Sequence, residues 1–122
     1  MDYSLLSDFE INKLVAKATS TSVEETYQFV NGGEDIADHM SGIVLMRKIS
    51  SNRKHWKLYD PCNNAADAWP IIVDNKINIR FGAEGMACEA QFIQYGHESV
   101  EFYHGNPLRA AMIVFLMMRD EK

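Results

Sequence analysis

Apolar positions spaced three and four residues apart predict a helix near the start of the chain. One face carries five of them at helical spacing: Phe9, Ile11, Leu14, Val15 and Ala18. Ser7 and Glu10 fit the S-x-x-E capping box, in which each side chain accepts a hydrogen bond from a free backbone amide at the helix start. The pattern therefore predicts a helix from Asp8 to about Ala18.

From Thr19 to Ile49, helix and strand both fit the pattern. Ser22 and Glu25 match a second capping box, whereas Tyr27 and Phe29 alternate as in a strand. The run GIVLMRKI that ends this segment is apolar and β-branched, which favours a strand. HWKLYD then alternates like a second strand, so the turn-like residues between the two runs predict a hairpin.

The stretch NNAADAWPIIVDNK combines a helix start with an internal proline. Asn63 or Asn64 is a good N-cap for the alanines that follow, and if Asn64 is the cap, Pro70 is the sixth helical residue. A proline there removes one hydrogen bond and kinks the helix, at a cost of about 3 kcal/mol. The alternative is a short turn followed by a new helix that begins at Pro70. In both cases we expect the isoleucines and Val73 after the proline to pack inward.

The remaining chain predicts three strands and a final helix. INIRF alternates apolar and polar residues, and MACEAQFIQY and SVEFYHG predict two more strands. Asn106 then caps a helix with Pro107 in its first position, which we expect to run to about Arg119. Because Ala110 to Met118 is apolar on every side, this helix should be the central core element.

These elements predict one α+β domain over residues 1–122. The expected architecture is a small antiparallel sheet of three to five strands, covered on one face by about three helices. A chain of this length with 47% apolar residues can bury a core without disulfides or metal. Its two cysteines do not form a disulfide framework.

Charge and hydropathy restrict the possible partners. The net charge of −5 argues against tight non-specific binding of nucleic acid. The longest apolar run, Ala110 to Met118, is too short to span a membrane, which takes about 20 residues. The N-terminus lacks the basic and apolar regions of a signal peptide. We therefore expect a cytoplasmic protein that makes no membrane contact.

Two candidate sites follow from the residue types. Cys62 precedes a helix start, where a thiol can become nucleophilic, and His55 or Asp60 could assist it in a small enzyme. No histidine or cysteine pair has metal-ligand spacing, so we predict neither a metal nor a cofactor. The basic segment from Arg47 to Lys57 contains no acid and could contact phosphates, as a nucleic-acid-binding module does.

Trp69 lies at the proline bend, where a large ring either anchors the helix in the core or stands exposed as a binding residue. A hairpin that ends at Tyr59 could bring the basic segment near it. The candidate binding residues are accordingly Arg53, Lys54, Trp56, Lys57, Asn63, Asn64 and Trp69.

Three segments resemble the NinX family of small lambdoid, P22-type phage proteins: DYSLLSDFEIN, CNNAADAWPIIVDNKI and NPLRAAMIVFLMM. The resemblance implies a phage or prophage origin and synthesis in the cytoplasm of a bacterial host. It implies no chemistry and transfers no functional residue. The favoured hypothesis is a non-enzymatic phage accessory protein that binds a host or phage macromolecule, a protein in preference to nucleic acid. The small enzyme and the nucleic-acid-binding module are the alternatives.

Overall fold

The computed structural model describes residues 2–27, 43–48, 56–94 and 96–120. Within them, the chain forms a short 3₁₀ helix, three α-helices and six strands. The helices are η1 (Tyr3–Leu5), α1 (Asp8–Ala18), α2 (Ala65–Asp74) and α3 (Pro107–Asp120). The strands are β1 (Val23–Tyr27), β2 (Ile43–Lys48), β3 (Trp56–Leu58), β4 (Asn78–Arg80), β5 (Cys88–Phe92) and β6 (Val100–His104). The predicted α+β class and the three helices are confirmed.

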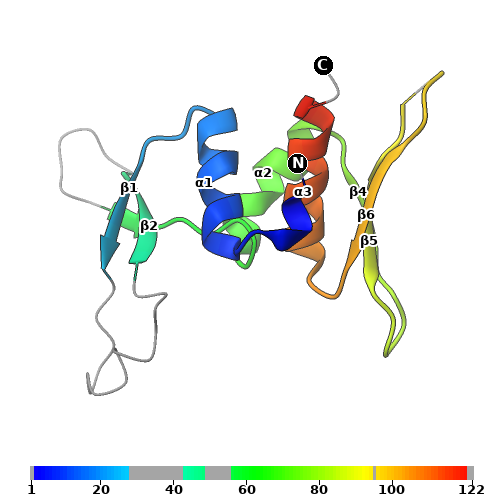
Figure 1. Ribbon diagram of the computed structural model, residues 1–122, viewed down its shortest axis with the longest axis horizontal. Coiled ribbons are helices and arrows are strands. Elements are labelled where there is room, and N and C mark those ends of the chain that lie inside the picture. Colours follow the sequence, from blue (N-terminus) through cyan, green and yellow to red (C-terminus); the bar gives the residue numbers. More distant parts are fainter. Residues whose placement is uncertain (1, 28–42, 49–55, 95, 121–122) are drawn as a thin grey trace.

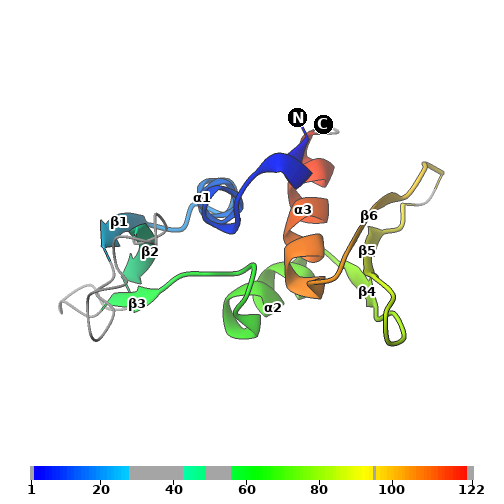
Figure 2. The same cartoon turned by 60° about the horizontal axis from the view of Figure 1, so that its bottom comes forward.

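The strands form two antiparallel sheets, where the sequence pattern suggested one. Sheet A has the order β1-β2-β3 and sheet B the order β4-β5-β6. The two sheets lie on opposite sides of the helices, as the two views show (Figures 1 and 2). Each sheet joins strands that follow one another in the chain, and α2 comes between them. Each sheet therefore forms from local pairings, and the helices between them cover one face of both.

Helix α3 is the centre of the larger core, as predicted. Every residue from Arg109 to Leu116 is buried, and Met112 and Ile113 have no exposed surface. Sheet B packs against α3, and α1 and α2 also contact it. Figure 2 shows α3 between sheet B and the other two helices. A helix enclosed in this way must be apolar on every side, which explains its sequence.

A smaller core joins sheet A to α1. It consists of the buried residues Ala16, Leu45 and Tyr59, with Phe9 and Val23 packed against them. The strand alternative for the segment after Thr19 is therefore the one the chain adopts as far as Tyr27. The predicted pairing of two strands around residues 50–54 agrees with the antiparallel β2–β3 pair, although that turn lies outside the described residues.

The predicted helix caps are confirmed. Ser7 and Glu10 form the reciprocal capping box of α1. The side chain of Asn106 accepts hydrogen bonds from two amides in the first turn of α3. Helix α2 begins after Asn64 and continues through Pro70. The prediction of a single helix that contains the proline is therefore correct, and the alternative of a new helix that begins at Pro70 is wrong.

Candidate functional site

The loop before α2 is fixed by a polar cluster that involves two of the predicted binding residues. The Asn63 side chain donates to Asp8 Oδ2 (3.0 Å) and to Asp60 Oδ2 (3.1 Å), and its oxygen accepts from Asn106 Nδ2 (3.0 Å). The Asn64 side chain caps α2 by accepting from the amide of Ala66 (2.8 Å). Both asparagines therefore use their polar atoms to hold the loop between α1 and α3.

The centre of this cluster is an ion pair between Asp8 and Arg109. Arg109 is buried and donates to Asp8 Oδ1 (2.6 Å) and to the carbonyl of Leu6 (2.7 Å). Burial alone would raise the pKa of Asp8, but hydrogen bonds from Asn63 and Arg109 hold that pKa below its usual value. These contacts tie the start of α1 to α3. The positions of Asp8 and Arg109 in the sequence gave no indication that the two residues pair.

Cys62 lies in the same cluster and is closed to solvent. Its side chain is 0% exposed, its amide donates to Asn12 Oδ1 (3.1 Å) and its carbonyl accepts from Asn106 Nδ2 (2.8 Å). Burial, together with the nearby charges of Asp8 and Asp60, raises the pKa of the thiol far above its ordinary value. A nucleophilic cysteine needs a lowered pKa and access to a substrate, and Cys62 has neither.

The proposed helpers of Cys62 do not form a catalytic pair with it. The Asp60 carboxylate accepts hydrogen bonds from Asn12 Nδ2 (2.8 Å) and from Asn63, and among the described residues no hydrogen bond joins it to the thiol. His55 lies outside the described residues. In the described part of the chain no three His, Cys, Asp or Glu side chains gather as a metal site would require.

The described ends of the basic segment, residues 47–48 and 56–57, belong to sheet A. Arg47 and Lys57 are opposite each other in the β2–β3 register, with Lys57 exposed and Arg47 half-buried. Arg47 lines a hollow against the face of α2 that carries Pro70 and Asp74. Trp56 begins β3, while Arg53 and Lys54 lie outside the described residues.

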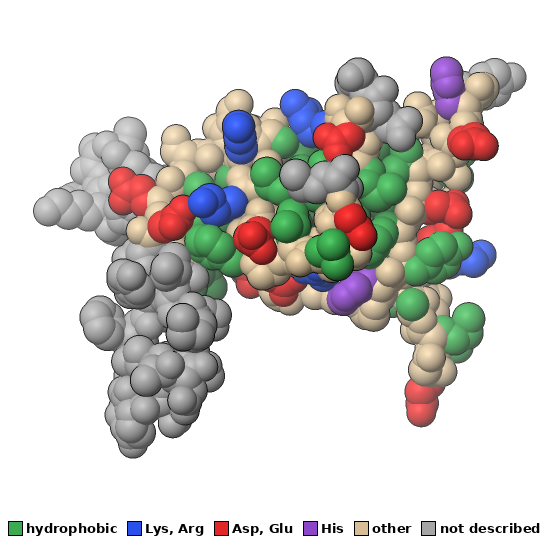
Figure 3. Space-filling view, in the orientation of Figure 1, with side chains coloured by type: hydrophobic (Ala, Val, Ile, Leu, Met, Phe, Trp, Pro, Cys, Tyr) green, Lys and Arg blue, Asp and Glu red, His purple; other side chains and the backbone are tan. Residues whose placement is uncertain are grey.

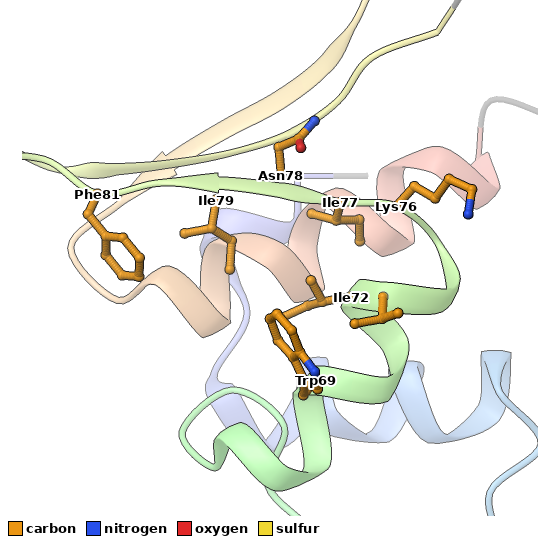
Figure 4. A pocket seen from close by; sticks show the side chains of 8 residues that line it. Trp69, Ile72, Lys76, Ile77, Asn78, Ile79 and Phe81 are labelled. Carbon is orange, nitrogen blue, oxygen red and sulfur yellow. The ribbon is translucent and has the colours of Figure 1, made fainter.

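Trp69 lies on a different face of α2, directed at sheet B. Its side chain is 60% exposed, so it does not anchor the helix in the core. Figure 4 shows its ring beneath β4, with Ile79 on the strand and Phe81 just after the end of the strand. The residues of α2 that face sheet A and those that face β4 therefore form separate surfaces, and Trp69 belongs to the second.

Between α2 and β4 the surface forms a groove of about 380 Å³, which we call the α2–β4 groove. Apart from one lysine and one asparagine, its lining is apolar. The lining residues are Trp69, Ile72, Val73, Lys76, Ile77, Asn78, Ile79 and Phe81. In Figure 4, the side chains of Ile77, Ile79 and Phe81 point from β4 and its flanks toward α2, while Asn78 points away.

The end of α2 sets the geometry of this groove. The amide of Lys76 donates to the carbonyl of Val73 (3.2 Å), and the amide of Ile77 donates to the carbonyl of Ile72 (3.0 Å). These two bonds are those of a Schellman motif, which turns the chain sharply after a helix. Lys76 takes the left-handed conformation (φ 55°) that glycine usually provides. The turn sends β4 back beside α2 and places Ile77 next to Ile72.

The groove gathers large apolar side chains that remain in contact with solvent. Phe81 is 72% exposed and Val73 is 49% exposed, and both line the groove with Trp69. Met86, in the adjoining hairpin, is 67% exposed. In Figure 3, apolar side chains stand out at the lower right, where the β4–β5 hairpin projects. Such a patch around a concave surface is characteristic of a protein-binding site.

Two expectations for these residues were wrong. Val73 was expected to pack inward with the isoleucines, but only Ile71 and Ile72 are buried. The alternation of INIRF also predicted Phe81 as part of a half-buried strand, but β4 ends at Arg80 and Phe81 is 72% exposed. The sequence signal for its exposure was an aromatic residue next to a glycine at the end of an alternating run. The sequence hypothesis named only Trp69 among the groove residues.

Comparison with known proteins identifies one family. The sequence model of the family described as "Bacteriophage P22, NinX" matches residues 2–119, nearly the whole chain. No curated protein and no solved structure matches the chain. Across the described residues, no helix has both the length and the apolar character needed to cross a membrane.

Proposed function

We propose that this chain, which belongs to the bacteriophage P22 NinX family, is a phage accessory protein that acts by binding another protein in the α2–β4 groove. It does so without catalysing a reaction. We place this binding in the cytoplasm of the bacterial host, where a phage protein is made.

The observation that supports the proposal is the exposed pair of aromatic rings at the groove. Trp69 and Phe81 are 60% and 72% exposed, and they stand on α2 and just after β4, across the same apolar hollow. Tryptophan is among the residues that contribute most to protein interfaces when a partner buries it. Covering both rings would remove apolar surface from water at a gain of about 25 cal/mol per Å².

The chemistry of the described residues favours a protein partner over a substrate or nucleic acid. The buried, protonated thiol of Cys62 supports no covalent catalysis. Within the described part of the chain, Lys76 is the sole cation lining the groove, whereas a nucleic-acid site needs several cations along its path. The net charge of −5 adds repulsion toward polyphosphate.

Affinity capture from phage-infected bacteria tests the proposal. Wild-type protein should retain a specific partner, and Trp69→Ala and Phe81→Ala should each lose most of it while remaining folded. Tyr103→Ala is the matched control, because Tyr103 is a 55% exposed aromatic on β6, outside the groove. It should retain the partner fully.

A fourth variant separates the groove from the basic segment. Lys57→Glu reverses an exposed charge on β3 and should leave capture unchanged if the groove is the binding surface. If Lys57→Glu abolishes capture while Trp69→Ala and Phe81→Ala retain the partner, the groove proposal is wrong. The basic segment then becomes the binding surface, and nuclease treatment of the lysate shows whether the captured molecule is nucleic acid.

A further inference from the structure

Strand β4, which borders the groove, has a free edge within the described part of the structure. Sheet B has the order β4-β5-β6, so β4 pairs on one side only. Among the described residues, the backbone of Asn78, Ile79 and Arg80 pairs with β5 alone. Alternate residues of a strand direct their amide and carbonyl groups to opposite edges. Part of the backbone of β4 therefore faces away from β5 and is available to a further strand.

We propose that the groove binds an extended segment of a partner protein, which pairs with β4 as a fourth strand of sheet B. This inference rests on the proposed function and specifies the form of the partner. Figure 4 shows β4 running along the upper side of the groove, with the rest of sheet B beyond it and α2 below. A segment beside β4 would lie between the strand edge and α2.

The side chains of the groove match such a segment. Ile77, Ile79 and Phe81 alternate along the strand and point to the same side, toward Trp69 (Figure 4). An added strand places its own alternate side chains in line with this row, because the side chains of neighbouring strands in a sheet share faces. The segment should therefore carry apolar residues at two alternating positions, with one of them against the indole ring.

The charge of the groove defines a third feature of the segment. Lys76 lines the groove at the end of α2, and no acidic side chain among the described residues lines it. Arg80, on the exposed side of β4, adds a second cation to the edge, although it pairs with Glu89 (3.4 Å). A carboxylate on the partner near Lys76 would complete the site. A second copy of this chain would bring another Lys76 to the interface and no carboxylate from its own groove, so the chemistry favours a different protein.

The test uses peptides as the probe. A displayed library of short random peptides is selected on the wild-type protein, after removal of those that bind Trp69→Ala. Selected peptides should show the pattern apolar–any–apolar with an acidic residue toward one end. Lys76→Glu should weaken their binding about tenfold, as loss of one favourable contact and gain of a repulsive one predicts. Lys17→Glu, the same charge change at an exposed residue of α1, should have no effect.

Backbone methylation of the best peptide then tests strand pairing directly. In an added strand only every second amide donates to β4, so N-methyl groups on that set should weaken binding about tenfold or more. The same groups on the other set should change binding little. Hydrogen exchange of the β4 amides should also slow when the peptide binds.

The outcomes separate the two proposals. A bound helix would be indicated by peptides that depend on Trp69 but carry apolar residues three and four positions apart. Such peptides would also lose binding when either set of amides is methylated. Strand addition would then be wrong while protein binding in the groove stands. Equal tolerance of both sets, with unchanged exchange of the β4 amides, would also overturn strand addition. If no selected peptide depends on Trp69, both proposals fail.

Discussion

Two phenylalanine substitutions compare the core with the groove by the same chemical change. Phe115 in α3 is 2% exposed, whereas Phe81 beside the groove is 72% exposed. A phenylalanine buries about 200 Å² when fully enclosed. At about 25 cal/mol per Å², Phe115→Ala should destabilise the protein by up to ~5 kcal/mol, consistent with the ~3–5 kcal/mol typical of such cavities. For Phe81, about a quarter of that area predicts ~1 kcal/mol.

Urea denaturation followed by tryptophan fluorescence or circular dichroism measures both values. With a slope of about 2 kcal/mol per molar urea, the midpoint should fall by ~2 M for Phe115→Ala and by ~0.5 M for Phe81→Ala. Binding of the peptide or partner, measured on each folded variant, should be weakened more by Phe81→Ala than by Phe115→Ala. A loss below about 1 kcal/mol for Phe115→Ala, or equal losses for the two variants, would refute the central position of α3.

Three further predictions follow from single residues. The pKa of Asp8 is lower in the folded state than in the unfolded state. The ionised carboxylate therefore stabilises the protein fully above the unfolded pKa of about 4, and this stabilisation is lost as the pH falls through the lower folded pKa. Asp8→Asn should accordingly flatten the acid side of the stability–pH curve. The thiol of Cys62, 0% exposed and with a raised pKa, should react with a thiol reagent at pH 8 only when urea opens the protein; a Cys88→Ser background isolates this signal, and fast native labelling would contradict it. Lys76→Gly should raise the free energy of unfolding by about 1 kcal/mol, since glycine accepts the left-handed conformation freely, while it weakens binding in the groove; a lower melting temperature would show that Lys76 is not strained.

Local features were predictable from the sequence because local interactions determine them. The capping box of Ser7 and Glu10 gave both the start and the class of α1. Asn106 and Pro107 likewise marked the start of α3, and the apolar run after them identified the centre of the core. Each of these signals involves residues within a few positions of one another, where capping and periodicity act.

Features that depend on distant residues were not predictable in the same way. The ion pair between Asp8 and Arg109 joins residues 101 positions apart, and neither has a neighbour that indicates the other. The division of the strands into two sheets depends on how α2 separates them, which a strand pattern does not record. The proline bend gave Trp69 as a candidate for exposure, but the strand that its ring faces depends on the Schellman turn at Lys76, which sends β4 back beside α2.

The place of α3 in the chain has a consequence for synthesis on the ribosome. Among the described elements this helix comes last in the sequence, yet it supplies the residues around which sheet B, α1 and α2 pack. A nascent chain that stops before Pro107 lacks both this surface and Arg109, the partner of Asp8. Chains grow at about 5–20 residues per second, so the earlier elements wait for α3 with their apolar faces uncovered. Folding of the main core therefore begins only when α3 has left the exit tunnel.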